Sequence, residues 1–90
     1  MQASRRVRIV NTKGLHARPC HAIVSAALDY KSDLRIASST HRVNGRSILE
    51  LMTLSAACGS ELEIFAEGED AQELVDQLVA LIEAGFDEVS

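Results

Sequence analysis

The sequence is poor in aromatic side chains, in proline and in long apolar stretches. Its 90 residues include no tryptophan, one tyrosine, two phenylalanines and one proline. Single-stranded nucleic acid is bound on aromatic platforms where bases stack, so this composition argues against a nucleic-acid partner. The apolar stretches are far short of the roughly 20 residues needed to cross a bilayer, and the N-terminus has no apolar signal core. We therefore expect a cytoplasmic protein that binds neither nucleic acid nor a membrane.

Cysteine is also scarce, with Cys20 and Cys58 at a spacing that is not typical of a metal site. Two cysteines suit a reducing compartment, where small buried thiols are more common than disulfides, although the sequence leaves their pairing open. His16, Cys20 and His21 carry atoms that zinc accepts as ligands. Adjacent residues of a helix point about 100° apart, so Cys20 and His21 are poorly placed to share an ion. We expect no metal.

The charged residues are unevenly distributed along the chain. All nine lysines and arginines lie in residues 1–46 with only two acids, whereas residues 47–90 hold the other eleven acids, and the net charge is −4. Folding can interleave the two halves. The asymmetry nevertheless predicts a positive region that suits a phosphate or an acidic partner.

The hydrophobic pattern predicts four strands and three helices. Alternation of apolar and polar residues indicates strands at residues 5–11, 33–38, 40–44 and 61–67. Apolar stripes of helical period indicate helices at 17–30 and 47–54, and a third helix between a capping pair at Asp70 and Glu73 and a C-terminal cap at Gly85. A second capping pair, Ser47 with Glu50, opens the helix at 47–54.

These elements follow each other in the order βαββαβα. Strands with one apolar face and helices with one apolar stripe imply two layers. We therefore expect an α+β fold in which three helices cover one face of a four-stranded antiparallel sheet and leave an all-polar face outside. The length fits one domain over residues 1–90.

The stretch GLHARPC at residues 14–20 combines groups that suit phosphate chemistry. Gly14 permits a bend and Pro19 fits the first turn of a helix, so His16 lies at or next to the helix N-cap. Backbone N–H groups without a helical acceptor attract anions there, and Arg18 adds a planar, permanently charged fork. The positive potential favours a neutral imidazole with a nucleophilic lone pair. His-x-Arg alone is a short motif, which also fits an exposed histidine without a chemical role.

Three segments of the sequence closely resemble the histidine-containing phosphocarrier family, HPr, of the bacterial phosphoenolpyruvate-dependent phosphotransferase system. They are GLHARP at 14–19, VNGRSILELMTL at 43–54 and the EGED turn at 67–70, and the similarity covers essentially the full length. The resemblance implies an open-faced β-sandwich. It also implies a stoichiometric phosphoryl carrier without a cofactor, rather than an enzyme with a small-molecule substrate.

The resemblance also implies roles for particular residues. His16 aligns with the histidine that accepts phosphate on Nδ1 from enzyme I and passes it to an enzyme IIA domain, and Arg18 aligns with the arginine that stabilises the phosphate. Ser47 falls where some relatives are phosphorylated by a dedicated serine kinase/phosphorylase. That phosphorylation weakens phosphotransfer. Capping the helix is a sufficient role for Ser47 by itself. Cys20 stands where relatives usually have alanine, and a buried inert thiol is favoured over one that is open to oxidation.

The helix SILELMTL is apolar almost all round. Leu51 and Leu54 can point into the core, which leaves Ile48, Leu49 and Met52 at least partly outward, and an exposed apolar cluster on a short helix usually marks a contact site. The resemblance implies that this helix and the start of the first helix form the face that donor and acceptor proteins use. The alternative is a helix that is sunk deeply enough to bury all its apolar side chains.

Three functions are open at this stage, and we expect a monomer in each case. The first is a phosphocarrier in sugar uptake. The second is a regulatory binding module whose phosphorylation state switches partners, because the C-terminal AGFDE also resembles the nitrogen-related paralogue NPr. A hydrolase is a weaker third, since no base and orienting acid can be assigned around Ser47 and 90 residues offer little pocket.

Overall fold

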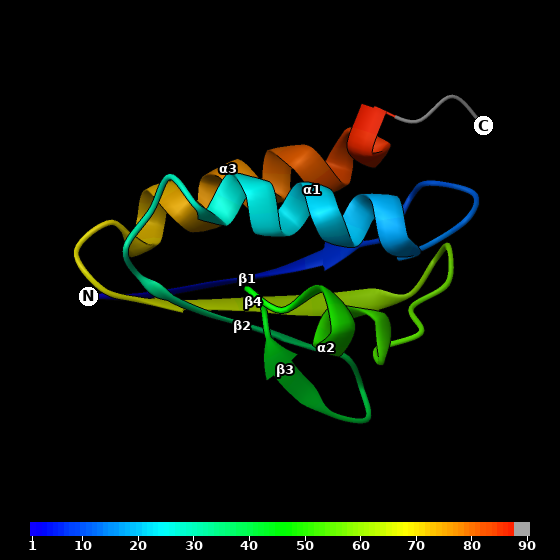
Figure 1. The fold of residues 1–90 in the computed structure, drawn as a ribbon, viewed down its shortest axis with the longest axis horizontal. Coiled ribbons are helices and arrows are strands. Elements are labelled where there is room, and N and C mark those ends of the chain that lie inside the picture. Colours follow the sequence, from blue (N-terminus) through cyan, green and yellow to red (C-terminus); the bar gives the residue numbers. More distant parts are fainter. Residues whose placement is uncertain (88–90) are drawn as a thin grey trace.

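The computed structural model describes residues 1–87, in which a four-stranded sheet carries helices on one side (Figure 1). The order βαββαβα is the predicted one. No helix of the described part is long and apolar enough to span a bilayer. The elements are β1 (Gln2–Arg8), α1 (Ala17–Ala27), β2 (Asp33–Ala37), β3 (Arg42–Asn44), α2 (Ile48–Met52), β4 (Glu61–Glu67) and α3 (Ala71–Glu83), followed by a 3₁₀ turn (Gly85–Asp87).

The strands form one antiparallel sheet in the order β1-β4-β2-β3. β2 and β3 form the predicted hairpin, with Ile36 opposite Val43. β4 lies between β1 and β2, so that Leu62 pairs with Val7 and Ile64 pairs with Ile36. The last strand of the chain therefore joins the first strand to the hairpin and completes the sheet.

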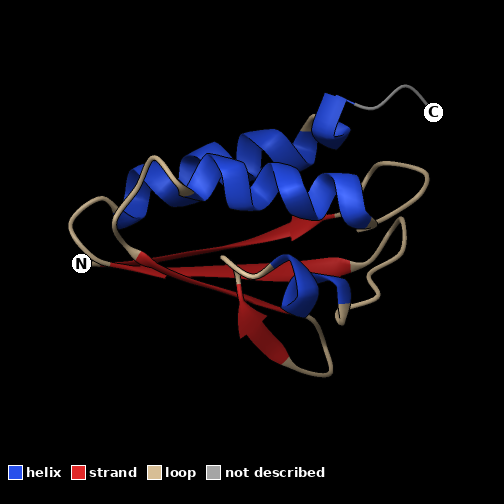
Figure 2. Ribbon diagram, viewed as in Figure 1, coloured by secondary structure: helices blue, strands red, loops and turns tan. Residues whose placement is uncertain are grey.

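The core lies between the sheet and the helices α1 and α3, which run across the same face (Figure 2). Along β4, Leu62, Ile64 and Ala66 point into this layer and are buried, as their alternation predicts. Burial of each large apolar side chain contributes roughly 1.5 to 3 kcal/mol, which is the main favourable term for so small a chain. The α+β arrangement with helices on one face is confirmed. The largest fully buried side chains are Ile9, Ile23, Leu34, Ile36, Leu51, Leu62, Ile64, Leu74, Leu78, Ile82, Val75 and Pro19.

Helix α1 ends at Ala27, three residues before the predicted end at Tyr30. Leu28, which the apolar stripe assigned to the core, is 73% exposed. The Arg46 guanidinium donates to the carbonyl oxygens of Ala27 at 2.7 Å, Tyr30 at 2.8 Å and Ser32 at 2.7 Å. Carbonyls at a helix end need partners from outside the helix, and here a distant arginine supplies them.

The predicted cap at Ser47 is half formed. The Ser47 hydroxyl oxygen accepts a hydrogen bond from the Glu50 N–H at 3.2 Å, as an N-cap does. The Glu50 carboxylate does not return the bond to Ser47, because it accepts from the Asn44 N–H at 3.0 Å. At the other end of the chain, Gly85 has φ +66° directly after the α3 C-cap residue and ends this helix as predicted.

Asp70 precedes α3, but its side chain makes no capping hydrogen bond to that helix, so this part of the predicted capping pair is wrong. The carboxylate instead accepts from the N–H groups of Lys31 at 2.8 Å and Ser32 at 3.0 Å, and from the Ser32 hydroxyl. The hydroxyl bond is the largest cause, and the Lys31 amide the next, of a lowered pKa for Asp70. The α1–β2 connection is thereby tied to the start of α3.

The prediction of an all-polar outer face of the sheet is wrong. Phe65 lies on this face, half-buried, with the Arg42 guanidinium 4.3 Å from its ring centroid. Such a cation–π contact covers the ring without a second layer. The ion pair of Arg6 with Glu61 at 3.8 Å on this face is exposed.

Candidate functional site

His16 is the N-cap residue of α1, with an extended backbone (φ −88°, ψ −171°) and a half-buried side chain. Its carbonyl accepts the first helical hydrogen bond, from the Cys20 N–H at 3.1 Å. The ring makes no capping hydrogen bond to the first turn. The N–H groups of Ala17 and Arg18 have no acceptor within the helix, and Pro19 has no N–H. The predicted position of His16 at the N-cap of this helix is therefore confirmed.

Electrostatics at this helix start favour an anion. Arg18 lies in the first turn, two residues after His16, and is exposed to solvent. No acidic residue occurs in the first turn of α1, so the charge of Arg18 and the positive end of the helix dipole are not cancelled there. A phosphoryl group at this position would meet backbone N–H donors and a guanidinium together.

The turn before His16 is joined to the loop that follows α2. Gly14 has φ +70°, a conformation that favours glycine, and forms the predicted turn. The next residue, Leu15, donates its N–H to the Ala56 carbonyl at 2.8 Å. Two segments that are far apart in the sequence, the GLHARPC motif and the loop after α2, thus lie side by side at the start of α1.

Helix α2 presents the apolar surface that the sequence predicts. Leu51 is fully buried and Leu54 is nearly so, whereas Leu49 is 79% and Met52 is 42% exposed. Ile48 is partly buried and packs against the core. The alternative of a helix sunk completely into the core is wrong. Ser47, the other predicted site residue, is the half-buried N-cap of this helix.

The two cysteines are free thiols in different surroundings. Cys20 is fully buried, as predicted, and burial raises the pKa of its thiol to about 11, so the thiol is protonated near neutral pH. Cys58 was also expected to be buried, but it is exposed in the loop after α2 with Sγ 3.7 Å from the Val10 carbonyl. No hydrophobic period covers that loop, so the burial of Cys58 could not be predicted from the sequence. His21 is an exposed helix residue, as predicted.

Sequence reasoning missed the roles of two residues, one before the start of α1 and one that acts at its far end. Asn11, predicted only as a strand end, is 4% exposed and donates its Nδ2 to the Gly14 carbonyl at 2.7 Å. An asparagine three residues before a turn glycine is a signal that could have indicated this role. Arg46 was counted only as a charge, and no local pattern indicates that it reaches three carbonyls of the α1–β2 segment.

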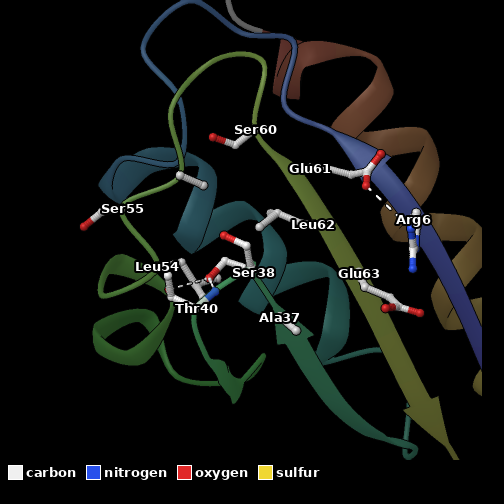
Figure 3. Close-up of a pocket in the computed structure, with 12 residues that line it drawn as sticks. Arg6, Ala37, Ser38, Thr40, Leu54, Ser55, Ser60, Glu61, Leu62 and Glu63 are labelled. Atoms are coloured by element: carbon white, nitrogen blue, oxygen red, sulfur yellow. Dashed lines mark hydrogen bonds and ion pairs between the residues drawn. The ribbon is translucent and has the colours of Figure 1, made fainter.

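A groove of about 570 Å³ opens beside the end of α2 (Figure 3). Ser38, Thr40, Ser55 and Ser60 are among the residues that line it. None of the predicted site residues is among the described residues that line it. The predicted phosphate site is thus a helix start at the surface, outside this groove.

Helices cover one face of an antiparallel sheet, and a histidine and an arginine lie at the start of the first helix. This combination of fold and site is that of the small histidine phosphocarriers. The family model described as PTS HPr component phosphorylation site matches residues 3–84. The chain belongs to this family, the HPr phosphocarriers of the phosphotransferase system. The resemblance of the three sequence segments to HPr is confirmed.

The relatives of this chain include proteins named HPr and proteins named NPr. A phosphocarrier protein HPr from Treponema pallidum (strain Nichols) is 40% identical over 91% of this chain and 93% of its own length. A phosphocarrier protein NPr from Shewanella violacea is 31% identical over 96% of this chain and 94% of its own length. Family membership therefore establishes the phosphocarrier class without choosing a branch of the system.

Solved structures agree with the fold. The structure of HPr-C-His from Thermoanaerobacter tengcongensis superposes with a TM-score of 0.92 at 34% identity, covering 98% of this chain and 99% of that chain. An HPr dimer from the same organism has a TM-score of 0.76 at 36% identity, covering 91% and 94%. The expectation of a monomer does not agree with that dimer, so the oligomeric state does not follow from the family.

Proposed function

We propose that this chain, as one domain over residues 1–90, accepts a phosphoryl group on Nδ1 of His16 from phosphoenolpyruvate-charged enzyme I and passes it to an enzyme IIA component that serves sugar uptake. It acts in the cytoplasm as a stoichiometric carrier and has no small-molecule substrate or cofactor of its own. Membership of the HPr family supports the proposal. The position of His16 at the N-cap of α1 is the observation that carries it.

The chemistry follows from the surroundings of His16. In the neutral ring the Nδ1 lone pair forms the new nitrogen–phosphorus bond, while the bond between phosphorus and the donor protein breaks. The phosphoryl oxygens then meet the amides of Ala17 and Arg18 and the Arg18 guanidinium, which stabilise negative charge. All of these groups lie at the surface, so the same phosphorus stays accessible to an acceptor. In the onward transfer, a nucleophile of the enzyme IIA component forms the new bond to phosphorus while the nitrogen–phosphorus bond at His16 breaks.

The partner proteins dock on the exposed side of α2 and on the start of α1. Leu49 and Met52 give this face its apolar area, and the hydrogen bond between Leu15 and Ala56 keeps it next to His16. Donor and acceptor then use one surface in turn, because both must reach the same imidazole. A few residues near the centre of such a contact contribute most of its binding energy.

Intact mass spectrometry tests the proposal. The chain is incubated with phosphoenolpyruvate and enzyme I, and an added phosphate that is lost in mild acid is expected, as for a phosphohistidine. His16→Ala must abolish the added mass, whereas His21→Ala, in an exposed histidine of the same helix, must retain it. Absence of phosphate on the unmodified chain, or an equal gain in His16→Ala, would contradict the proposal.

A second candidate is a regulatory module of the nitrogen-type branch. The similarity to NPr favours it, together with the AGFDE segment, whose Glu88 lies outside the described residues. The two candidates share the phosphorylation of His16 and differ in the acceptor. Transfer from the phosphorylated chain to a sugar-type enzyme IIA supports the first candidate, and preferential transfer to a nitrogen-type enzyme IIA supports the second.

Ser47 is a candidate for regulation by a serine kinase/phosphorylase. Its hydroxyl oxygen already accepts from the Glu50 N–H, so a phosphate there would lie at the start of α2 and keep that role. The added negative charge would lie beside the docking face and would oppose an acidic partner. Treatment with such a kinase, followed by the transfer assay, measures whether the modification slows phosphorylation of His16.

A further inference from the structure

The turn that leads into His16 is closed by a buried asparagine. Asn11 is 4% exposed, and its Nδ2 donates to the Gly14 carbonyl at 2.7 Å. The Gly14 N–H donates back to the Asn11 carbonyl at 3.1 Å. The same Gly14 carbonyl also accepts the His16 N–H at 3.0 Å. The carboxamide of Asn11 and the backbone of His16 are therefore linked through one shared oxygen.

A second contact holds the same turn from the opposite side. Leu15 is 5% exposed, and its N–H is bonded to Ala56 at 2.8 Å. Ser55, directly before Ala56, has φ +49°, which a side-chain-bearing residue seldom adopts. Strained backbone of this kind is maintained where the surrounding structure fixes it. Residues 14–16 thus lie between Asn11 and the loop after α2.

We propose that Asn11 is a positioning residue for His16. This inference rests on the phosphocarrier function proposed above. Asn11 acts through Gly14 by fixing where the backbone of His16 enters α1, so that the imidazole stays aligned with the first-turn amides and Arg18. Phosphoryl transfer is sensitive to the placement of the nucleophile, and displacement by about 1 Å can cost on the order of 100-fold in rate. The hydrogen bond donated by Nδ2 of Asn11 is the contact through which this positioning acts.

Variants at Asn11 separate positioning from folding. Asn11→Leu keeps the branched arrangement of side-chain heavy atoms without a donor, and Asn11→Ala removes the carboxamide. Ser32→Ala is the matched control, because Ser32 is 2% exposed and its hydroxyl also donates a side-chain hydrogen bond, which is partly buried and goes to Asp70, away from His16. The KM and kcat for phosphorylation of each variant by enzyme I are measured on the folded proteins.

The expected result is a fall in kcat of about tenfold or more for both Asn11 variants with KM changed less than about twofold, since the docking face on α2 is intact. Ser32→Ala keeps the kcat of the unmodified chain. Partial unfolding alone would raise the apparent KM and leave kcat unchanged, because only folded chains react. An unchanged kcat in folded Asn11→Leu, or an equal fall in Ser32→Ala, overturns the proposal.

A readout without partner proteins keeps this inference separate from the proposed function. In ¹⁵N NMR, the His16 ring signals of Asn11→Leu are expected to move, and the Leu15 N–H to exchange faster with solvent, whereas Ser32→Ala leaves both unchanged. If the unmodified chain accepts no phosphate, the proposed function fails while this experiment still decides whether Asn11 positions His16. Unmoved ring signals in Asn11→Leu overturn the positioning role even if phosphorylation is observed.

Discussion

Gly14 packs so closely against Ala56 that a Cβ at position 14 would lie 2.5 Å from the Ala56 carbonyl oxygen. Real Cβ atoms do not approach an oxygen so closely, and the obstacle is backbone that cannot rotate away. Only glycine therefore allows the turn before α1 to meet the loop after α2. The contact explains why a glycine is placed two residues before the phosphoacceptor candidate.

Gly14→Ala should lower the free energy of unfolding by about 3 kcal/mol, because it adds a steric clash to the cost of φ +70°. Gly59→Ala is the control, since Gly59 has φ +92° with no atom within 4 Å of the added Cβ, and it should lose about 1 kcal/mol. Urea denaturation measures both. Equal losses would mean that the Ala56 contact adds nothing.

Leu49→Asp should weaken docking while leaving the fold intact. Leu49 is 79% exposed on the proposed docking face, so a charge there should raise the KM for enzyme I about tenfold. Leu28→Asp is the matched control, because Leu28 is 73% exposed just after the end of α1. Steady-state phosphorylation and urea denaturation should show that only Leu49→Asp changes KM, with stability altered by about 0.5 kcal/mol or less in both.

Arg46→Ala should destabilise the protein by about 2 kcal/mol, since it removes the charged donor from three backbone carbonyls. Arg46→Lys should recover only part of this loss, because an ammonium group cannot reproduce the planar fork. Arg6→Ala removes an exposed arginine at 3.8 Å from Glu61 and should change stability by about 0.5 kcal/mol or less. A denaturation midpoint for Arg46→Lys equal to that of the unmodified chain would contradict the multidentate role.

Asp70 should make stability depend on pH in the acid range. Its hydrogen bonds to Ser32 and Lys31 lower its pKa in the folded state, so the stabilisation is present above the unfolded pKa, about 3.9, and is lost as the pH falls through the folded value. Asp70→Asn should therefore be less stable near neutral pH and lose less stability on acidification. Parallel pH curves for Asp70→Asn and the unmodified chain would argue against this linkage.

The two thiols should differ in reactivity. Near neutral pH, iodoacetamide should modify Cys58 rapidly and leave Cys20 unmodified, because Cys20 is fully buried with its pKa raised to about 11. Mass spectrometry of Cys58→Ser should show no adduct until denaturant is added. A rapid adduct on folded Cys58→Ser would show that Cys20 is accessible.

The sequence determined the features that depend on near neighbours in the chain. Alternation placed Leu62 and Ile64 in the core, and the first-turn proline with a preceding glycine placed His16 at a helix start. These are consequences of backbone geometry over a few residues. The element order and the outward position of Leu49 could be predicted for the same reason.

Only the tertiary structure decided the contacts between segments that are distant in the chain. It turned Asp70 away from α3 toward Ser32, directed Arg46 to the end of α1, and brought Ala56 beside Leu15. Each of these partners is chosen by the packing of helices against the sheet, after which buried polar groups must find whatever donor or acceptor lies within reach. Local propensity carries no information about that proximity, which places the loop after α2 beside the turn that leads into His16.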